Sequence, residues 1–187
     1  MAARESGLSR IEELRLRMEG NRMNTAELFD DLEAFADEEA ATLGIDRAEV
    51  LRRVLSHVRP DRTKHIAWHL MHLAVTEEFI FGDGVQQALW EQYKAGSDAV
   101  ETVPDLETIR NQMAFSRSHL LQALDRLSDD DLLVRPPLLP DCREPYIEII
   151  HELIWHEPYH MIECQRLFDH YRLVRSASQP LHRKAVA

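Results

Sequence analysis

The last part of the chain, from about Pro145 to Val174, has the periodicity of one long amphipathic helix. Its apolar residues recur at intervals of three, four and seven, the spacing that places side chains on one face of a helix. Two histidines stand on this face, which comprises Ile149, Leu153, His156, His160, Leu167 and Tyr171. A helix of this length can bury such a face only against other helices, so the segment predicts a helical protein.

Five further segments have the same helical pattern, and several begin at a residue that can cap a helix. We expect helices from Ser9 to about Gly20, from Asn24 to Gly44, from Asp46 to Pro60, from about Lys64 to Phe81, and from Asp105 to about Leu127. No segment has the alternation of a strand, and no repeat or interdomain linker is visible. The pattern predicts an all-α helical bundle with an extra N-terminal helical segment. We expect one domain over residues 1–187, with a core at about 24–175, an accessory helix in 1–23 and a tail at 176–187.

Composition narrows the possible partners and the compartment. The formal net charge of -11 argues against binding to nucleic acid or to an anionic membrane surface. No stretch is long and apolar enough to span a bilayer, and the N-terminus lacks the apolar run of a signal peptide. Two cysteines imply no disulfide framework: Cys164 is expected in a core and Cys142 in a Pro-flanked loop. We therefore expect a cytoplasmic protein.

The placement of the histidines predicts a metal site. The chain has 10 histidines, so a pair four residues apart carries little weight until its position is considered. His156 and His160 replace apolar residues on the core-facing side of the last helix, where a buried imidazole needs a partner for each nitrogen. His72 lies on an apolar helical face with Trp68 and Val75. A metal ion satisfies several buried imidazoles together, so His72, His156 and His160 are the predicted ligands.

The other histidines are expected outside the site. His69 shares its helical stripe with Arg62, His65 and Thr76, which predicts a bundle edge or the surface. The remaining five are predicted to be solvated or structural: His57, His119, His151, His170 and His182.

Two familiar metal motifs are excluded by their missing ligands. His156 to His160 spells H-E-x-x-H, the signature of zinc peptidases, but position 166 is Arg166 and no glutamate follows Glu163. Pro158 also interrupts that motif. A ferritin-like di-iron site needs Glu-x-x-His on two helices, whereas both such pairs here share the last helix.

Three segments in order resemble the DinB/YfiT-like family of metal-dependent four-helix bundles. They read HIAWHLMHLAVTEEF, VPDLETIRNQMAFSRSHLLQALDRLSDDDL and IIHELIWHEPYHMIECQRLF, and the resemblance covers about residues 24–175. It implies an up-down-down-up bundle that binds one divalent ion through His72, His156 and His160, and a homodimer. Characterised relatives include thiol-dependent S-transferases and isomerases, which implies a small-molecule substrate and a low-molecular-weight thiol as partners.

One departure from the family affects the pocket. The family usually has Gly-Gln soon after the second histidine of the last helix, where this chain reads Met161-Ile162-Glu163. The bulkier and acidic side chains reshape the pocket wall, so the substrate class does not carry over. Glu163, three residues after His160, is the candidate for a carboxylate behind the ligands or for a general base. Glu157 is rotated off the histidine face and is assigned to the surroundings of the site or the surface.

These residues leave two functional classes open. Three neutral imidazoles suit zinc best, with nickel or iron as alternatives, and they leave coordination positions free. The first class is a metal-dependent enzyme, either thiol S-transferase-like or a hydrolase. The second is a non-catalytic, metal-binding stress-response bundle that acts as a dimer.

Overall fold

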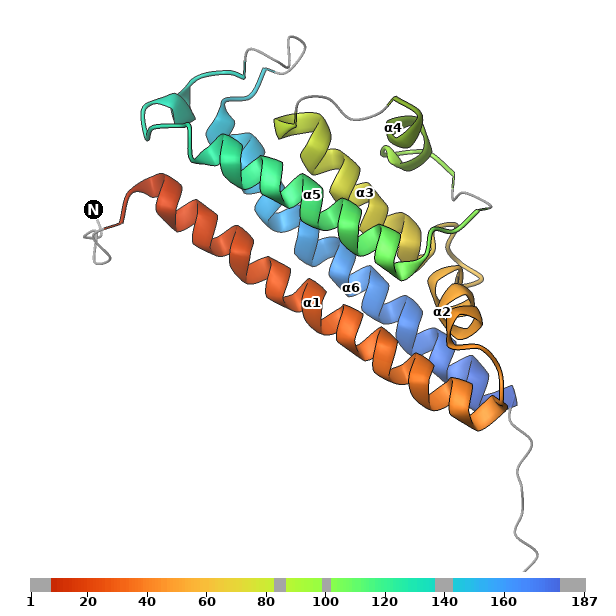
Figure 1. Cartoon of the computed structure of the whole chain (residues 1–187). Coiled ribbons are helices and arrows are strands. Elements are labelled where there is room, and N and C mark those ends of the chain that lie inside the picture. The colour runs from red at the N-terminus through yellow and green to blue at the C-terminus, as the bar shows by residue number, and fades with distance from the viewer. Residues whose placement is uncertain (1–7, 83–86, 99–101, 137–142, 179–187) are drawn as a thin grey trace, which may run out of the picture.

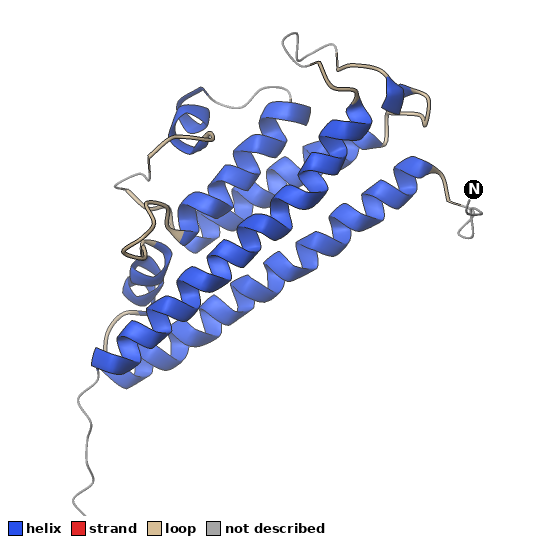
Figure 2. Ribbon diagram, turned by 180° about the vertical axis from the view of Figure 1, so that it is seen from behind, coloured by secondary structure: helices blue, strands red, loops and turns tan. Residues whose placement is uncertain are grey.

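A computed structural model describes residues 8–82, 87–98, 102–136 and 143–178. Within these ranges every regular element is helical (Figures 1 and 2). The elements are α1 (Arg10–Leu43), α2 (Arg47–Leu55), α3 (Ile66–Phe81), α4 (Gln87–Tyr93), α5 (Leu106–Leu124), the short 3₁₀ helix η1 (Asp131–Leu133) and α6 (Tyr146–Ser178). The all-α prediction is confirmed.

The four long helices α1, α3, α5 and α6 form the bundle. Helix α3 packs against both α5 and α6, and α1 packs along α6. Helices α1 and α6 run in one direction and α3 and α5 in the other, which is the up-down-down-up arrangement (Figure 1). The short helix α2 packs on α1 and α3, and α4 packs on α3. The site residues on α3 and α6 therefore come from two adjacent antiparallel helices.

Helix α1 is continuous where the sequence predicted two helices. Ser9 caps it as expected, with the reciprocal hydrogen bonds of a capping box to Glu12. The predicted end near Gly20 and new start at Asn24 are wrong, because the helix runs on to Leu43. A glycine inside a helix costs only about 1 kcal/mol. Buried side chains on both sides of it outweigh that cost: Leu14 and Met18 before it, Leu28 and Leu32 after it.

Gly20 should therefore be a position where alanine stabilises the protein. Nothing lies within 4 Å of a Cβ built at Gly20, so Gly20→Ala should raise the free energy of unfolding by about 0.5–1 kcal/mol through helix propensity alone. Urea unfolding followed by circular dichroism measures the change. Gly44→Ala is the matched control with the opposite sign. Gly44 ends α1 at φ 66, where a side chain costs about 1–2 kcal/mol. Destabilisation by Gly20→Ala would contradict the continuous helix.

The other helices begin close to their predicted starts. Asp46 caps α2 and Asp105 caps α5, each accepting a hydrogen bond from a backbone N–H in the first turn. Helix α2 ends at Leu55, well before Pro60, and the short helix η1 follows α5. Local cap chemistry thus sets these starts.

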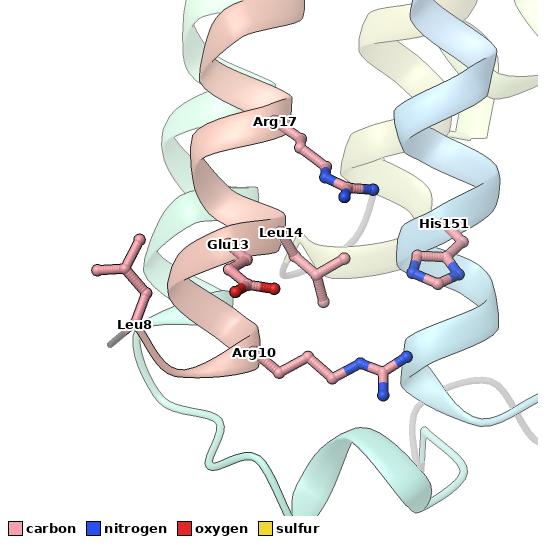
Figure 3. A pocket seen from close by; sticks show the side chains of 6 residues that line it. All are labelled: Leu8, Arg10, Glu13, Leu14, Arg17 and His151. Carbon is pink, nitrogen blue, oxygen red and sulfur yellow. The ribbon is translucent and has the colours of Figure 1, made fainter. Parts of the chain in front are cut away.

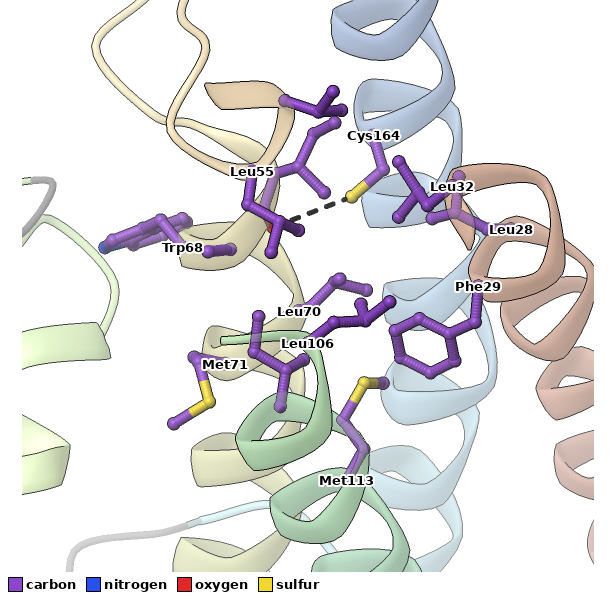
Figure 4. Close-up of a cluster of buried hydrophobic side chains, with 14 of the residues drawn as sticks. Leu28, Phe29, Leu32, Leu55, Trp68, Leu70, Met71, Leu106, Met113 and Cys164 are labelled. Atoms are coloured by element: carbon purple, nitrogen blue, oxygen red, sulfur yellow. Dashed lines mark hydrogen bonds between the residues drawn. The ribbon is translucent and has the colours of Figure 1, made fainter. Parts of the chain in front are cut away.

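The largest apolar core lies where α1, α3, α5 and α6 meet (Figure 4). Cys164 is fully buried in it, with its Sγ 4.0 Å from the carbonyl oxygen of Ile66, so the core prediction for Cys164 is confirmed. A second apolar cluster, which includes Leu14, Leu120 and Ile150, fills the bundle near the start of α1. Cys142 and His182 lie outside the described residues. Among the described helices, none has the length and apolar character needed to cross a membrane.

Candidate metal site

The three predicted ligands meet between α3 and α6. His72 lies in the middle of α3, and His156 and His160 lie one turn apart on α6. The Nε2 atoms of His72 and His156 are 3.1 Å apart, and those of His156 and His160 are 3.0 Å apart. His72 and His160 are buried, and His156 is half-buried. The structure brings all three residues to one point.

The nitrogen distances fit a common ion. Two imidazole nitrogens bound to one zinc ion at 2.0–2.1 Å lie about 3.0–3.4 Å apart, depending on the coordination angle. Each of the three residues offers one potential ligand atom, and these three atoms lie within 4.8 Å of one another. A three-nitrogen donor set of this kind fits a divalent ion of the first transition row. The residues could therefore hold a metal ion.

The ring protons of the three histidines also favour a bound cation. His72 Nδ1 lies 2.6 Å from the backbone carbonyl oxygen of Tyr93. A carbonyl only accepts, so Nδ1 donates, and the Nε2 of a neutral His72 carries a bare lone pair. His156 Nε2 faces both this lone pair and His160 Nε2, and its single proton can satisfy only one of them. A cation would satisfy all three nitrogens, whereas hydrogen bonds among them leave one without a partner.

Elements around the site hold His72 in place. The indole of Trp68 stacks on the His72 imidazole with ring centroids 4.7 Å apart and an interplanar angle of 12°. The Nε1–H of Trp68 donates to the hydroxyl of Ser97 at 3.1 Å. Tyr93, whose carbonyl accepts from His72, ends α4. The segment around Trp90, which carries no clear helical pattern in the sequence, thus positions His72.

The sequence predicted that His69 lies at a bundle edge or at the surface, and this prediction is wrong. His69 is buried, and its Nδ1 lies 2.7 Å from the Nδ1 of His160. His65 is buried as well, and its side chain caps α3 by accepting from the N–H of Trp68 at 2.9 Å. The prediction is wrong because α3 is covered on nearly every side by its neighbours. The sequence could have placed His69 through the pairing of the two helices. If His72 contacts His156 across an antiparallel helix pair, His69, one turn earlier, must lie near His160, one turn later.

Burial keeps these imidazoles neutral. It lowers the pKa of His69 and of His156 to about 4 and that of His160 to about 2, with further lowering by neighbouring histidines. The pKa of His72 is also lowered, chiefly by burial. At neutral pH the side chains are therefore in the form that binds a metal.

Glu163 lies on the same helix, beyond His160. Its carboxylate is buried and accepts a hydrogen bond from Arg166 Nη1 at 2.6 Å, and its second oxygen lies 3.7 Å from Arg62 Nε. Its charge acts on His69, where it opposes the effect of burial on the pKa. Its assignment as a general base stays a prediction.

Pro158 lies in α6 between His156 and His160, and a residue of a second helix compensates for the N–H that proline lacks. Proline has no N–H, so the carbonyl of Ile154, four residues earlier, loses its usual partner within the helix. The side-chain amide of Asn21 on α1 donates to that carbonyl at 2.7 Å. The turn that separates His156 from His160 is thus tied to α1.

Glu157 belongs to a buried charge cluster that the sequence did not predict. The cluster comprises Arg22, Glu77, Arg117 and Glu157, one residue from each long helix of the bundle. Arg117 Nη2 contacts Glu77 at 2.5 Å and Glu157 at 2.6 Å. Arg22 contacts the same two carboxylates at 3.2 and 3.4 Å. Two positive and two negative charges balance in the interior of the bundle.

Hydroxyl groups complete this cluster. Thr25 donates to Glu157 at 2.6 Å, and Ser116 donates to Glu77 at 3.1 Å. Glu157 is buried and contacts Arg22, Arg117 and Thr25, so it is not a surface residue. Its ion pairs and hydrogen bond join α6 to α1 and α5.

The other histidines that the sequence assigned to solvated or structural positions lie outside the site where the structure describes them. His57 and His170 contact each other at 2.7 Å between α6 and the end of α2, and His119 contacts the carboxylate of Glu78 at 2.9 Å. His151 lines a hollow of about 330 Å³ between the starts of α1 and α6, together with Arg10 and Arg17 (Figure 3). The three predicted ligands do not line this hollow.

Comparison with known proteins supports the family that the motifs suggest. No curated protein matches the chain, and no solved structure matches it. A family model described as the DinB superfamily matches residues 17–164, which include all three histidines and the four long helices except for the ends of α1 and α6. The chain belongs to the DinB superfamily.

Proposed function

We propose that the protein is a metal-dependent enzyme of the thiol S-transferase or hydrolase type, with His72, His156 and His160 as ligands of one divalent ion. The observation that carries the proposal is the convergence of three Nε2 atoms, 3.0 and 3.1 Å apart, between α3 and α6. A divalent ion held by neutral imidazoles keeps its full charge and lowers the pKa of a water or thiol that binds to it. Zinc suits the donor set best, with nickel and iron as alternatives.

The surrounding residues have defined tasks in this proposal. Tyr93 orients His72 through its carbonyl, and Trp68 covers one face of that imidazole. Glu163 is the proposed general base. We propose a low-molecular-weight thiol as a partner and the cytoplasm as the compartment, where a reduced Cys164 is the norm.

An exposed apolar stripe on α6 supports a second candidate function. The outer face of α6 exposes Trp155, Tyr159 and Ile162, which lie at intervals of four and three residues on one stripe. An exposed apolar stripe is typical of a protein–protein interface. It supports a homodimer, and with it the alternative of a non-catalytic, metal-binding stress-response bundle. Sedimentation equilibrium measures the oligomeric state, and a monomer would remove the support for this alternative.

Metal content tests the ligand assignment. Protein purified in zinc-containing buffer should carry about one ion per chain, and His72→Ala should lose most of it because two nitrogens hold an ion far less tightly than three. Elemental analysis measures both. His57→Ala is the control, since it removes a half-buried histidine that contacts only other rings. Equal metal content in the parent and in His72→Ala would refute the assignment.

A thiol-transfer screen separates the two functions. The zinc-loaded protein is incubated with low-molecular-weight thiols and a panel of electrophiles, and product is measured against His72→Ala. The enzyme proposal expects turnover that is lost in the variant. A fully loaded protein without turnover in transfer or hydrolysis favours the non-catalytic alternative.

A further inference from the structure

Behind the proposed ligands, a fourth histidine touches one of them from the side opposite the site. The Nε2 of His160 faces His156 at 3.0 Å, and its Nδ1 faces the Nδ1 of His69 at 2.7 Å. The two nitrogens of an imidazole direct their lone pairs or protons to different sides of the ring. The Nδ1 of His69 therefore contacts His160 on the side of the ring that faces away from the point where the three Nε2 atoms meet.

The contact between two Nδ1 atoms permits only one proton. If both nitrogens carried a proton they would repel each other, and if neither did there would be no hydrogen bond. Binding of an ion at His160 Nε2 requires the proton of that neutral ring to be on Nδ1. His160 then donates, His69 accepts, and the proton of a neutral His69 is on its Nε2.

The surroundings of His69 keep this arrangement rigid. His69 is 8% exposed and lies edge-on to Trp68, with ring centroids 5.4 Å apart. The charge of Glu163 acts on His69, and Glu163 is itself held by Arg166. Metal-binding histidines commonly donate their second nitrogen to an acceptor that fixes the ring, and loss of that acceptor weakens metal binding.

We propose that His69 is a positioning residue that fixes the Nδ1–H tautomer of His160, presents its Nε2 to the metal and so sets the metal affinity of the site. The inference rests on the proposed function. It assigns His69 a role that the three-histidine motif does not contain.

A comparison of His69→Leu with His69→Asn tests whether the hydrogen-bond acceptor at position 69 sets the zinc affinity. His69→Leu removes the acceptor from a buried place and should raise the dissociation constant for zinc about 10- to 100-fold. In His69→Asn the amide oxygen can take the place of Nδ1 as acceptor, so this variant should recover most of the affinity. Zinc affinity is measured by competition with a chromophoric chelator.

The control removes an equivalent contact elsewhere. His57→Leu eliminates the other histidine–histidine contact of 2.7 Å, between residues that are not ligands, and should leave zinc affinity unchanged. A parent-like dissociation constant in His69→Leu would overturn the inference, and so would an asparagine variant as weak as the leucine variant. The proposed function fails separately, if the parent itself binds no zinc or if His72→Ala binds as tightly as the parent.

Nitrogen-15 NMR of the zinc-loaded parent gives a readout that needs no variant. The ring of His69 should carry its proton on Nε2 and show an unprotonated Nδ1, and His160 should be protonated at Nδ1. A proton on Nδ1 of His69, or ligation of zinc through Nδ1 of His160, would overturn the inference even if the His69 variants do not fold.

Discussion

Replacement of Glu157 with methionine should lower the free energy of unfolding by about 3–5 kcal/mol, the cost of leaving a buried charge without its partner. Methionine has a volume close to that of glutamate, so little of the loss can come from a cavity. Arg117 would lose the carboxylate that it contacts at 2.6 Å, and Arg22 would lose the one at 3.4 Å. Two guanidinium groups would then share Glu77 alone in the core of the bundle.

Denaturant unfolding of four proteins tests this coupling: the parent, Glu157→Met, Arg117→Met and the double variant. Removal of both charges restores the balance, since Arg22 and Glu77 remain, so the double variant should lose less than the sum of the single losses. Glu49→Met is the surface control. Glu49 forms ion pairs with Arg52 and Arg53 that are exposed to solvent, so its loss should cost far less than the loss of Glu157. Additive losses in the double variant would show that the cluster does not act as a unit.

Acid should destabilise the metal-free protein as the pH falls from 7 to 5. An imidazole whose pKa is lower in the folded than in the unfolded chain binds its proton mainly after unfolding, so acid favours the unfolded chain. For His69 and His156 the pKa falls from 6.5 to about 4. Their contribution is complete above pH 6.5 and is lost as the pH falls toward 4. By pH 5 the loss is about 2 kcal/mol for each of them, and His160 adds a loss of the same sign.

Urea unfolding at half-unit steps from pH 7 to pH 5 measures this slope. Each of these histidines contributes about 1.4 kcal/mol per pH unit once the pH is below 6. In His156→Leu one of the titrating groups is gone, so its slope should be shallower by about that amount. A slope in the variant equal to that of the parent would show that His156 binds its proton as readily in the folded chain as in the unfolded one.

Much of the fold follows from local chemistry that the sequence displays. Asp46, Asp105 and Ser9 start helices where their side chains can accept a backbone hydrogen bond, and the structure has helices at those points. Gly20 misled the prediction because its local cost is small and the packing that overrides it is tertiary. A glycine marks a helix end only when the chain beyond it has nothing to bury on the same face.

The site was predictable to the extent that it depends on one helical face. His156 and His160 interrupt an apolar stripe, and His72 does so on its own helix, which is a pattern that one sequence can show. His69 and Glu157 were missed because their partners are on other helices. From one sequence, a polar residue on a helix is predicted to face solvent, because the neighbours that cover it are not known.

Pro158, between His156 and His160, also depends on a residue of another helix. Asn21 lies in the stretch that the sequence pattern set aside as accessory, yet it completes the backbone of the ligand-bearing helix at Ile154. A substitution at position 21 would release a buried carbonyl beside both histidines without touching either of them. Positions 21 and 158 are therefore coupled: a residue with a backbone N–H at position 158 would itself donate to the Ile154 carbonyl, and the amide of Asn21 would no longer be needed there.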